Sequence, residues 1–160
     1  MIKINFLPLP TDSIRLLQRG NPDADGNAPE CHISDGNGNA CRHCLSKVKK
    51  GDKFLIVAHR PFATCQPYAE QGPIFLHASE CASYKGNLHL PHMYKGRKTL
   101  LLRGYDEKER IVYGTGQTVR TDRIEFAAHQ ILTNKNVTFI HARSATNNCY
   151  QFRIEPAHDV

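Results

Sequence analysis

The sequence contains no apolar run that could cross a membrane. A spanning helix needs about 18 to 20 consecutive apolar residues, and no stretch of the chain approaches that length. The first residues also lack the basic segment and the following apolar segment of a secretory leader. These absences predict a cytosolic protein without a membrane partner. Its six cysteines are then expected to be reduced thiols or metal ligands rather than disulfides.

Two common catalytic motifs are missing as well. The chain has no Gly-x-Ser-x-Gly, the turn that presents a serine nucleophile. The segment Gly114-Thr115-Gly116 lacks the rest of either glycine-rich phosphate-binding fingerprint. Serine hydrolase, dinucleotide and ATP chemistry are therefore not expected.

Positive charge is in excess but is not concentrated. The formal net charge is +6, and its densest clusters are Lys47-Lys49-Lys50 and Lys95-Arg97-Lys98. Neither cluster has the length or the interleaved aromatic residues of a nucleic-acid platform. We expect a solvated basic surface and no nucleic-acid partner, and the oligomeric state is left open.

The chain is long enough and apolar enough for one folded domain, residues 1–160, because 40% of its residues are hydrophobic and 22% charged. Apolar patterns predict helices over 13–18 and 123–132 and a long polar loop over 20–40. They predict strands over 2–7, 54–58, 73–78, 99–105, 110–113, 137–142 and 149–154. Hairpin-length connections favour an α+β fold, a mainly antiparallel sheet of about six or seven strands with one or two packed helices.

Several short blocks, taken together and in order, resemble the bacterial family called domain of unknown function 1203. The blocks are Cys41-Arg42-His43-Cys44-Leu45, Pro61-Phe62 with Gln66-Pro67-Tyr68-Ala69-Glu70, Gly72-Pro73-Ile74-Phe75-Leu76-His77-Ala78, Leu102-Arg103-Gly104-Tyr105, and Ile140-His141-Ala142-Arg143 with Cys149-Tyr150. The resemblance covers residues 41 to about 155. It implies a small single-domain bacterial protein and brings no activity. The polar loop with Cys31-His32 looks unlike the segment expected in that family.

Cys41 and Cys44 have the spacing of two thiolates in a zinc-binding turn. A zinc ribbon needs a second Cys-x-x-Cys, which the chain lacks. The sequence does not decide which residues would complete the site. Some candidates are near in sequence and others could be near in space: Cys31, His32, His43, Cys65, His77, Cys81 and His89. Zinc is therefore a candidate cofactor, and a zinc-stabilised interaction module is the alternative function.

The same two thiols could instead carry redox chemistry, activated by Arg42 or His43. A redox Cys-x-x-Cys usually opens a helix after a strand, whereas residues 45–51 are short and turn-like. Buried, unreactive thiols are favoured over a redox centre.

The first functional hypothesis rests on charged and polar residues at strand ends. His77 and His141 each follow a Phe by two residues, at the ends of two predicted strands. Guanidinium groups bind carboxylates and phosphates through paired hydrogen bonds, and imidazoles can move a proton. We expect a small anionic ligand, a carboxylate or phosphate, to be bound by Arg42, Arg103, Arg143 and Tyr68.

If the protein is an enzyme, His77 or His141 is the expected general base. The hypothesis requires that these side chains share one cleft. Arginines at strand ends also form ion pairs that only tie loops together, so a plain interaction protein without a site is the remaining possibility.

Overall fold

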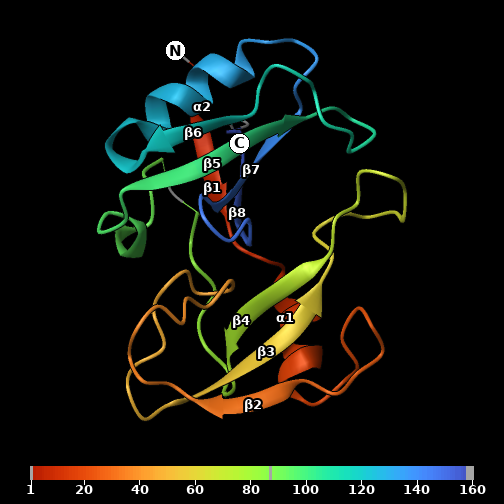
Figure 1. Ribbon diagram of the computed structural model, residues 1–160, viewed down its shortest axis with the longest axis vertical. Coiled ribbons are helices and arrows are strands. Elements are labelled where there is room, and N and C mark those ends of the chain that lie inside the picture. The colour runs from red at the N-terminus through yellow and green to blue at the C-terminus, as the bar shows by residue number, and fades with distance from the viewer. Residues whose placement is uncertain (1, 87, 158–160) are drawn as a thin grey trace. The chain divides into compact units, whose positions relative to one another are not determined.

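A computed structural model describes residues 2–86 and 88–157 (Figure 1). The chain divides into two compact units. Unit 1 combines residues 1–7, 62–69 and 85–160, and unit 2 combines residues 8–61 and 70–84. That residues 1–160 form a single domain stays a prediction.

Unit 1 is built on an antiparallel five-stranded sheet in the order β1-β8-β7-β5-β6 (Figure 1). Its strands are β1 Ile4–Leu7, β5 Thr99–Tyr105, β6 Gln117–Arg120, β7 Phe139–Ser144 and β8 Tyr150–Pro156. Two short 3-10 turns, η1 His92–Tyr94 and η2 Thr121–Arg123, and the helix α2 Ile124–Leu132 complete the unit. The helix contacts β5 and β7, because Ile124, Ala128 and Ile131 recur at helical spacing and are buried.

The predicted strand at 110–113 is wrong. The partner of β5 is β6, residues 117–120, and residue Ile111 makes only an isolated bridge to Tyr105. The chain leaves β5 through a turn in which Glu109 has φ of 60°. It turns again at Gly114, with φ of 88°, a conformation that glycine adopts without steric cost. The strand that pairs with β5 therefore begins one turn later in the chain than predicted.

Unit 2 contains an antiparallel three-stranded sheet in the order β2-β3-β4. Its strands are β2 Glu30–Ile33, β3 Lys53–His59 and β4 Gly72–His77, and its helix is α1 Thr11–Gln18. Val57 pairs with Ile74, and both side chains are buried. Because strand residues alternate between faces, His77 lies on the face opposite Ile74 and Leu76.

Strand β2 lies inside the segment predicted as a long polar loop. All four of its residues are exposed, so no buried face marks it in the sequence. The α+β class with mainly antiparallel strands is confirmed, with eight strands within the described residues, divided between sheets of five and three.

Among the described residues, no helix combines the length and the apolar character needed to cross a membrane. The cytosolic location stays a prediction.

Candidate metal centre

Residues 40–47 form a closed turn, here called the CxxC turn, which carries Cys41 and Cys44. A bridge between Ala40 and Lys47 joins its ends. Inside it, the Leu45 N–H donates to the Cys41 carbonyl at 3.0 Å. Leu45 has φ of 50°, which is uncommon for a residue with a side chain, and its side chain is buried. Backbone bonds and packing thus fix the positions from which both thiols project.

The CxxC turn lies along the edge of β4. Cys41 forms a parallel bridge with Phe75, and the Arg42 N–H donates to the Phe75 carbonyl at 3.1 Å. The His77 N–H donates to Cys41 Sγ at 3.4 Å. The first thiol of the turn is therefore anchored beside the last residue of β4.

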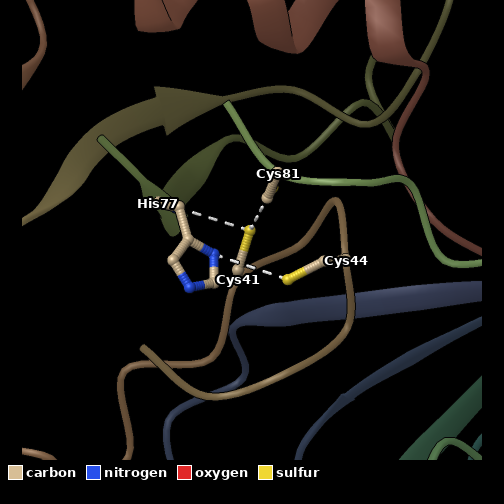
Figure 2. Close-up of side chains that lie close together, drawn as sticks. All are labelled: Cys41, Cys44, His77 and Cys81. Carbon is tan, nitrogen blue, oxygen red and sulfur yellow. Dashed lines mark hydrogen bonds between the residues drawn. The ribbon is translucent and has the colours of Figure 1, made fainter. Parts of the chain in front are cut away.

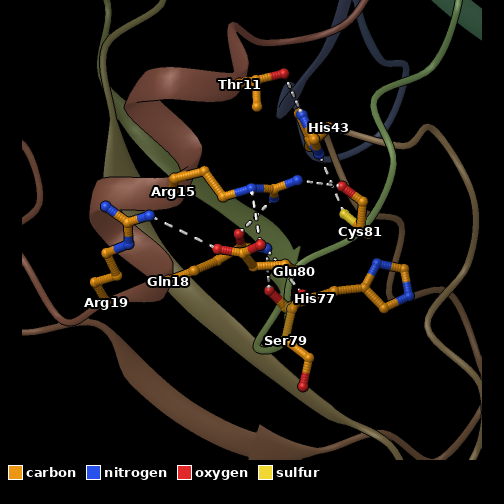
Figure 3. Close-up of polar contacts among 9 residues, drawn as sticks. All are labelled: Thr11, Arg15, Gln18, Arg19, His43, His77, Ser79, Glu80 and Cys81. Carbon is orange, nitrogen blue, oxygen red and sulfur yellow. Dashed lines mark hydrogen bonds and ion pairs between the residues drawn. The ribbon is translucent and has the colours of Figure 1, made fainter.

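Helix α1 holds the segment that follows β4, residues 77–81, here called the exit segment. Gln18 Nε2 donates to the carbonyls of His77 and Ser79, each at 3.0 Å (Figure 3). Arg15 Nη2 donates to the Cys81 carbonyl at 2.7 Å. These three bonds fold the exit segment back so that the Cys81 side chain faces the CxxC turn.

The structure brings four ligand atoms together, from Cys41, Cys44, His77 and Cys81 (Figure 2). All four lie within 4.8 Å of one another. Cys41 Sγ is 3.9 Å from Cys81 Sγ, and Cys44 Sγ is 3.4 Å from His77 Nδ1. A tetrahedral zinc ion with Zn–S of about 2.3 Å and Zn–N of about 2.0 Å separates two sulfurs by about 3.8 Å and a sulfur from a nitrogen by about 3.5 Å. The observed separations fit such a centre.

Hydrogen bonds within the cluster favour the thiolate form of Cys41. Bonds from the Cys44 thiol and from His77 lower the pKa of Cys41 to about 3, against the opposing effect of burial. The bond to Cys41 raises the pKa of Cys44 and, together with the thiolate charge, that of His77. Burial raises the pKa of Cys81. A metal cation bound to three thiolates would replace these protons, so binding is coupled to proton release.

A second histidine supports Cys81. His43 Nδ1 lies 3.2 Å from Cys81 Sγ, and His43 Nε2 lies 2.9 Å from Thr11 Oγ1 (Figure 3). Burial lowers the pKa of His43, so the ring is neutral near pH 7. If Cys81 binds a metal as a thiolate, it only accepts hydrogen bonds, so Nδ1–H would then donate to Cys81 and the Thr11 hydroxyl to Nε2. Such contacts orient metal ligands and tune their basicity.

A protein-family model matches residues 38–156, and its description is "Protein of unknown function (DUF1203)". The chain belongs to the DUF1203 family. The resemblance noted in the sequence is thereby confirmed. Comparison with curated proteins and with solved structures gives no match.

All four cluster residues lie inside the DUF1203 match, whereas Cys31 and His32 precede it. Cys31 and His32 are exposed on β2 and take no part in the cluster. Cys65 and His89, two other candidate ligands, belong to unit 1. The candidate metal centre is thus formed entirely by unit 2 and by residues that the family match covers.

The residues predicted to bind an anion are divided between the two units of this DUF1203 chain. Arg42 and His77 belong to unit 2, and the other four belong to unit 1: Tyr68, Arg103, His141 and Arg143. Arg42 is 3% exposed. Its Nη1 donates to the Ala40 carbonyl at 2.5 Å, and its guanidinium lies 5.9 Å from the centre of the Phe75 ring. Arg42 therefore helps to fix the CxxC turn against β4.

In unit 1, Arg103 on β5 stands directly opposite His141 on β7. His141 is 0% exposed, and four aromatic rings lie 4.9 to 5.1 Å from it, those of Phe62, Tyr105, Phe139 and Tyr150. Arg143 Nη1 donates to the Asn148 carbonyl at 3.2 Å. The Tyr68 hydroxyl lies 3.0 Å from that of Tyr113. Ligand binding or catalysis by these residues stays a prediction.

Unit 2 also has a cavity of about 420 Å³, and none of the predicted anion-binding residues lines it. Its lining includes Asp23, Asp25 and Glu30. Asp23 accepts backbone hydrogen bonds, the largest influence being that of Ala58, and these lower its pKa. The acidic lining opposes an anionic ligand.

Two members of the cluster were not singled out by the sequence. His77 was predicted as a general base and, like Cys81, was also one of several candidate ligands. The available signal was the spacing His77-x-x-x-Cys81 at the end of a predicted strand. Together with Cys41-x-x-Cys44, it supplies the Cys3His set that structural zinc sites use.

Proposed function

We propose that this protein binds one zinc ion through Cys41, Cys44, His77 and Cys81, and that the ion stabilises unit 2 as an interaction module. The proposal rests chiefly on the four ligand atoms within 4.8 Å of one another. Three sulfurs and one imidazole favour zinc over calcium or magnesium, because those cations prefer oxygen ligands. Cys3His is one of the common sets of structural zinc.

The arrangement suits a structural ion rather than a catalytic one. Four protein ligands fill a tetrahedral coordination sphere, so no position is left for water or substrate. Cys41 is 0% exposed. The ion would link the CxxC turn to β4 and the exit segment, which are more than thirty residues away along the chain. A closed centre of this kind contributes to folding, and the function of unit 2 is then carried by its surface.

The metal content of the purified protein tests this proposal. Protein made without a histidine tag is expected to carry one zinc per chain by elemental mass spectrometry. Cys44→Ser is expected to lose most of it, because three ligands remain. Cys65→Ser is the matched control, since Cys65 is exposed and outside the cluster. A wild-type protein that folds stably without metal would contradict the proposal.

Helix α1 is expected to contribute to zinc affinity without contacting the ion. Arg15→Ala removes the donor to the Cys81 carbonyl and leaves the exit segment held only through Gln18. We expect zinc to bind about tenfold more weakly, which is the smaller effect usually found when a residue that supports a metal ligand is substituted. Competition with a chromogenic chelator measures this.

Arg19→Ala is the matched control on the same helix. Arg19 is 68% exposed and lies 3.9 Å from Glu80, an exposed ion pair that contributes little. Its substitution is expected to leave zinc affinity unchanged. Equal losses in Arg15→Ala and Arg19→Ala would show that general helix stability, not the bond to Cys81, is responsible.

The anion-binding hypothesis has less support. Arg42 and His77, two of its residues, already contribute to the CxxC turn and to the metal cluster. Binding of a small carboxylate or phosphate therefore stays a prediction, carried by the residues of unit 1.

A further inference from the structure

The thiols of the cluster are not equivalent toward one another. Cys41 Sγ and Cys81 Sγ lie 3.9 Å apart, at van der Waals contact between sulfurs. Cys44 Sγ lies 3.4 Å from His77 Nδ1, and the Cys44 thiol also hydrogen-bonds Cys41. Figure 2 shows Cys81 reaching toward Cys41 from the exit segment, with Cys41 and Cys44 on the same side of the His77 imidazole. The contact between Cys41 and Cys81 joins two segments that are 40 residues apart in the chain.

The two sulfurs also differ in access. Cys41 is 0% exposed, whereas Cys81 is partly exposed and follows the exposed Glu80. A small oxidant therefore reaches Cys81 before Cys41. His43 contacts Cys81 Sγ at 3.2 Å, and Cys41 contacts the same sulfur. The sulfur of Cys81 is thus held between the two and remains directed at Cys41.

We propose that a hydroperoxide converts Cys41 and Cys81 into a disulfide that releases the zinc and replaces its link between the CxxC turn and the exit segment. This inference rests on the zinc centre proposed above. The same cluster is then also a site of reversible oxidation, and the oxidants are peroxides.

The reaction balances in two steps. The Cys81 thiolate attacks one peroxide oxygen, so that an S–O bond forms, the O–O bond breaks and hydroxide leaves. The Cys41 thiolate then attacks the Cys81 sulfur, so that the S–S bond forms, the S–O bond breaks and a second hydroxide leaves. The peroxide gains two electrons and the two sulfurs lose two. Protons from the buffer neutralise both hydroxides, and zinc keeps only Cys44 and His77 as ligands, too few to retain it.

The oxidised form is expected to keep the fold of unit 2. The new bond joins the same two segments that the ion joined. Two backbone bonds beside it do not depend on the metal, from the Arg42 N–H to the Phe75 carbonyl at 3.1 Å and from the Tyr84 N–H to the His43 carbonyl at 3.0 Å. A disulfide within the CxxC turn, between Cys41 and Cys44, would form no covalent link to the exit segment.

The test uses the full chain, purified under reducing conditions, with its zinc content measured first. Hydrogen peroxide is added, zinc release is followed with a chromogenic chelator, free thiols are alkylated, and disulfide-linked peptides are mapped by mass spectrometry. We expect release of the full equivalent of zinc, a linked peptide containing Cys41 and Cys81, and an unfolding temperature above that of reduced protein treated with chelator. A dominant Cys41–Cys44 peptide, or zinc release with only sulfinic acids, would overturn the inference.

Two variants sharpen the result. Cys44→Ser is expected to form the Cys41–Cys81 disulfide as the wild type does, and Cys81→Ser is expected to form none at Cys41. If Cys44→Ser does not fold, the peptide map of the oxidised wild type still shows whether Cys41 pairs with Cys81 or with Cys44. Protein that carries no zinc would contradict the proposed function, and peroxide treatment of that metal-free protein would then test the pairing of Cys41 with Cys81 separately.

Discussion

Replacing Cys41 with serine is expected to unfold unit 2 at 25 °C while the sheet of unit 1 stays folded. Structural zinc in small modules binds with about 10–16 kcal/mol, which is comparable to the total stability of about 5–15 kcal/mol of an ordinary domain. Cys41 is also the most constrained of the proposed ligands, because it is buried, pairs with Phe75 and accepts the His77 N–H. A serine hydroxyl at this position is a poor zinc ligand at neutral pH.

Amide hydrogen exchange measures this effect within one molecule. Amides of β3 and β4, such as those of Val57 and Leu76, are expected to lose protection in Cys41→Ser. Amides of β7, such as that of Ile140, are expected to keep it, because β7 pairs with β5 and β8 within unit 1. Removal of zinc from the wild type by a chelator is expected to give the same pattern without any substitution.

Cys31→Ser is the matched control in unit 2. Cys31 is exposed on β2 and is not part of the cluster, so the variant is expected to keep both its zinc and its exchange protection. If β3 and β4 stay protected in Cys41→Ser and in chelator-treated wild type, then zinc does not stabilise unit 2 and the proposed function is wrong.

The sequence predicts the elements that carry a buried apolar pattern. The strands at 54–58, 73–78 and 99–105 were expected from their apolar runs, and β3, β4 and β5 occur there. Strand β2 could not be expected in this way, because its four exposed residues are strand only through their pairing with β3. Burial leaves a signal in composition, whereas an exposed edge strand is defined by its partner.

In the candidate site as well, residues close in sequence could be recognised, whereas those brought together by long-range contacts could not. The pair Cys41 and Cys44 was recognised because zinc-binding turns have a fixed spacing. Cys81 was given little weight, because it has no cysteine nearby in sequence to form a pair. Its proximity to Cys41 depends on the bridge between Cys41 and Phe75 and on the bond from Arg15 to the Cys81 carbonyl. Neither contact leaves a pattern in the sequence.

The role of His77 was predicted from its place at a strand end, which suits a base and a metal ligand equally. The structure adds what the pattern lacked, a thiol sulfur at 3.4 Å from Nδ1 and two more cysteines within 4.8 Å. These observations favour a ligand over a general base.

Two substitutions at His77 separate these roles. Loss of a contact that supports a ligand weakens metal binding by up to about 100-fold. His77→Ala removes a proposed ligand itself, so we expect zinc binding to weaken by more than that. His77→Cys is expected to restore one zinc per chain, because four cysteines are a common structural set and a cysteine sulfur reaches a metal from nearly the same Cβ position as Nδ1. Elemental analysis and chelator competition measure both.

Cobalt substitution gives an independent readout of the same exchange of ligands. The sulfur-to-metal absorption of the Co²⁺ form of His77→Cys is expected to rise by about one third, because four thiolates replace three around the ion. His89→Cys is the control: His89 is an exposed histidine of unit 1, and a cysteine there is expected to leave this absorption unchanged. Zinc bound as tightly by His77→Ala as by the wild type would instead show that the imidazole is not a ligand, and His77 would remain a candidate base beside a cluster of three thiols.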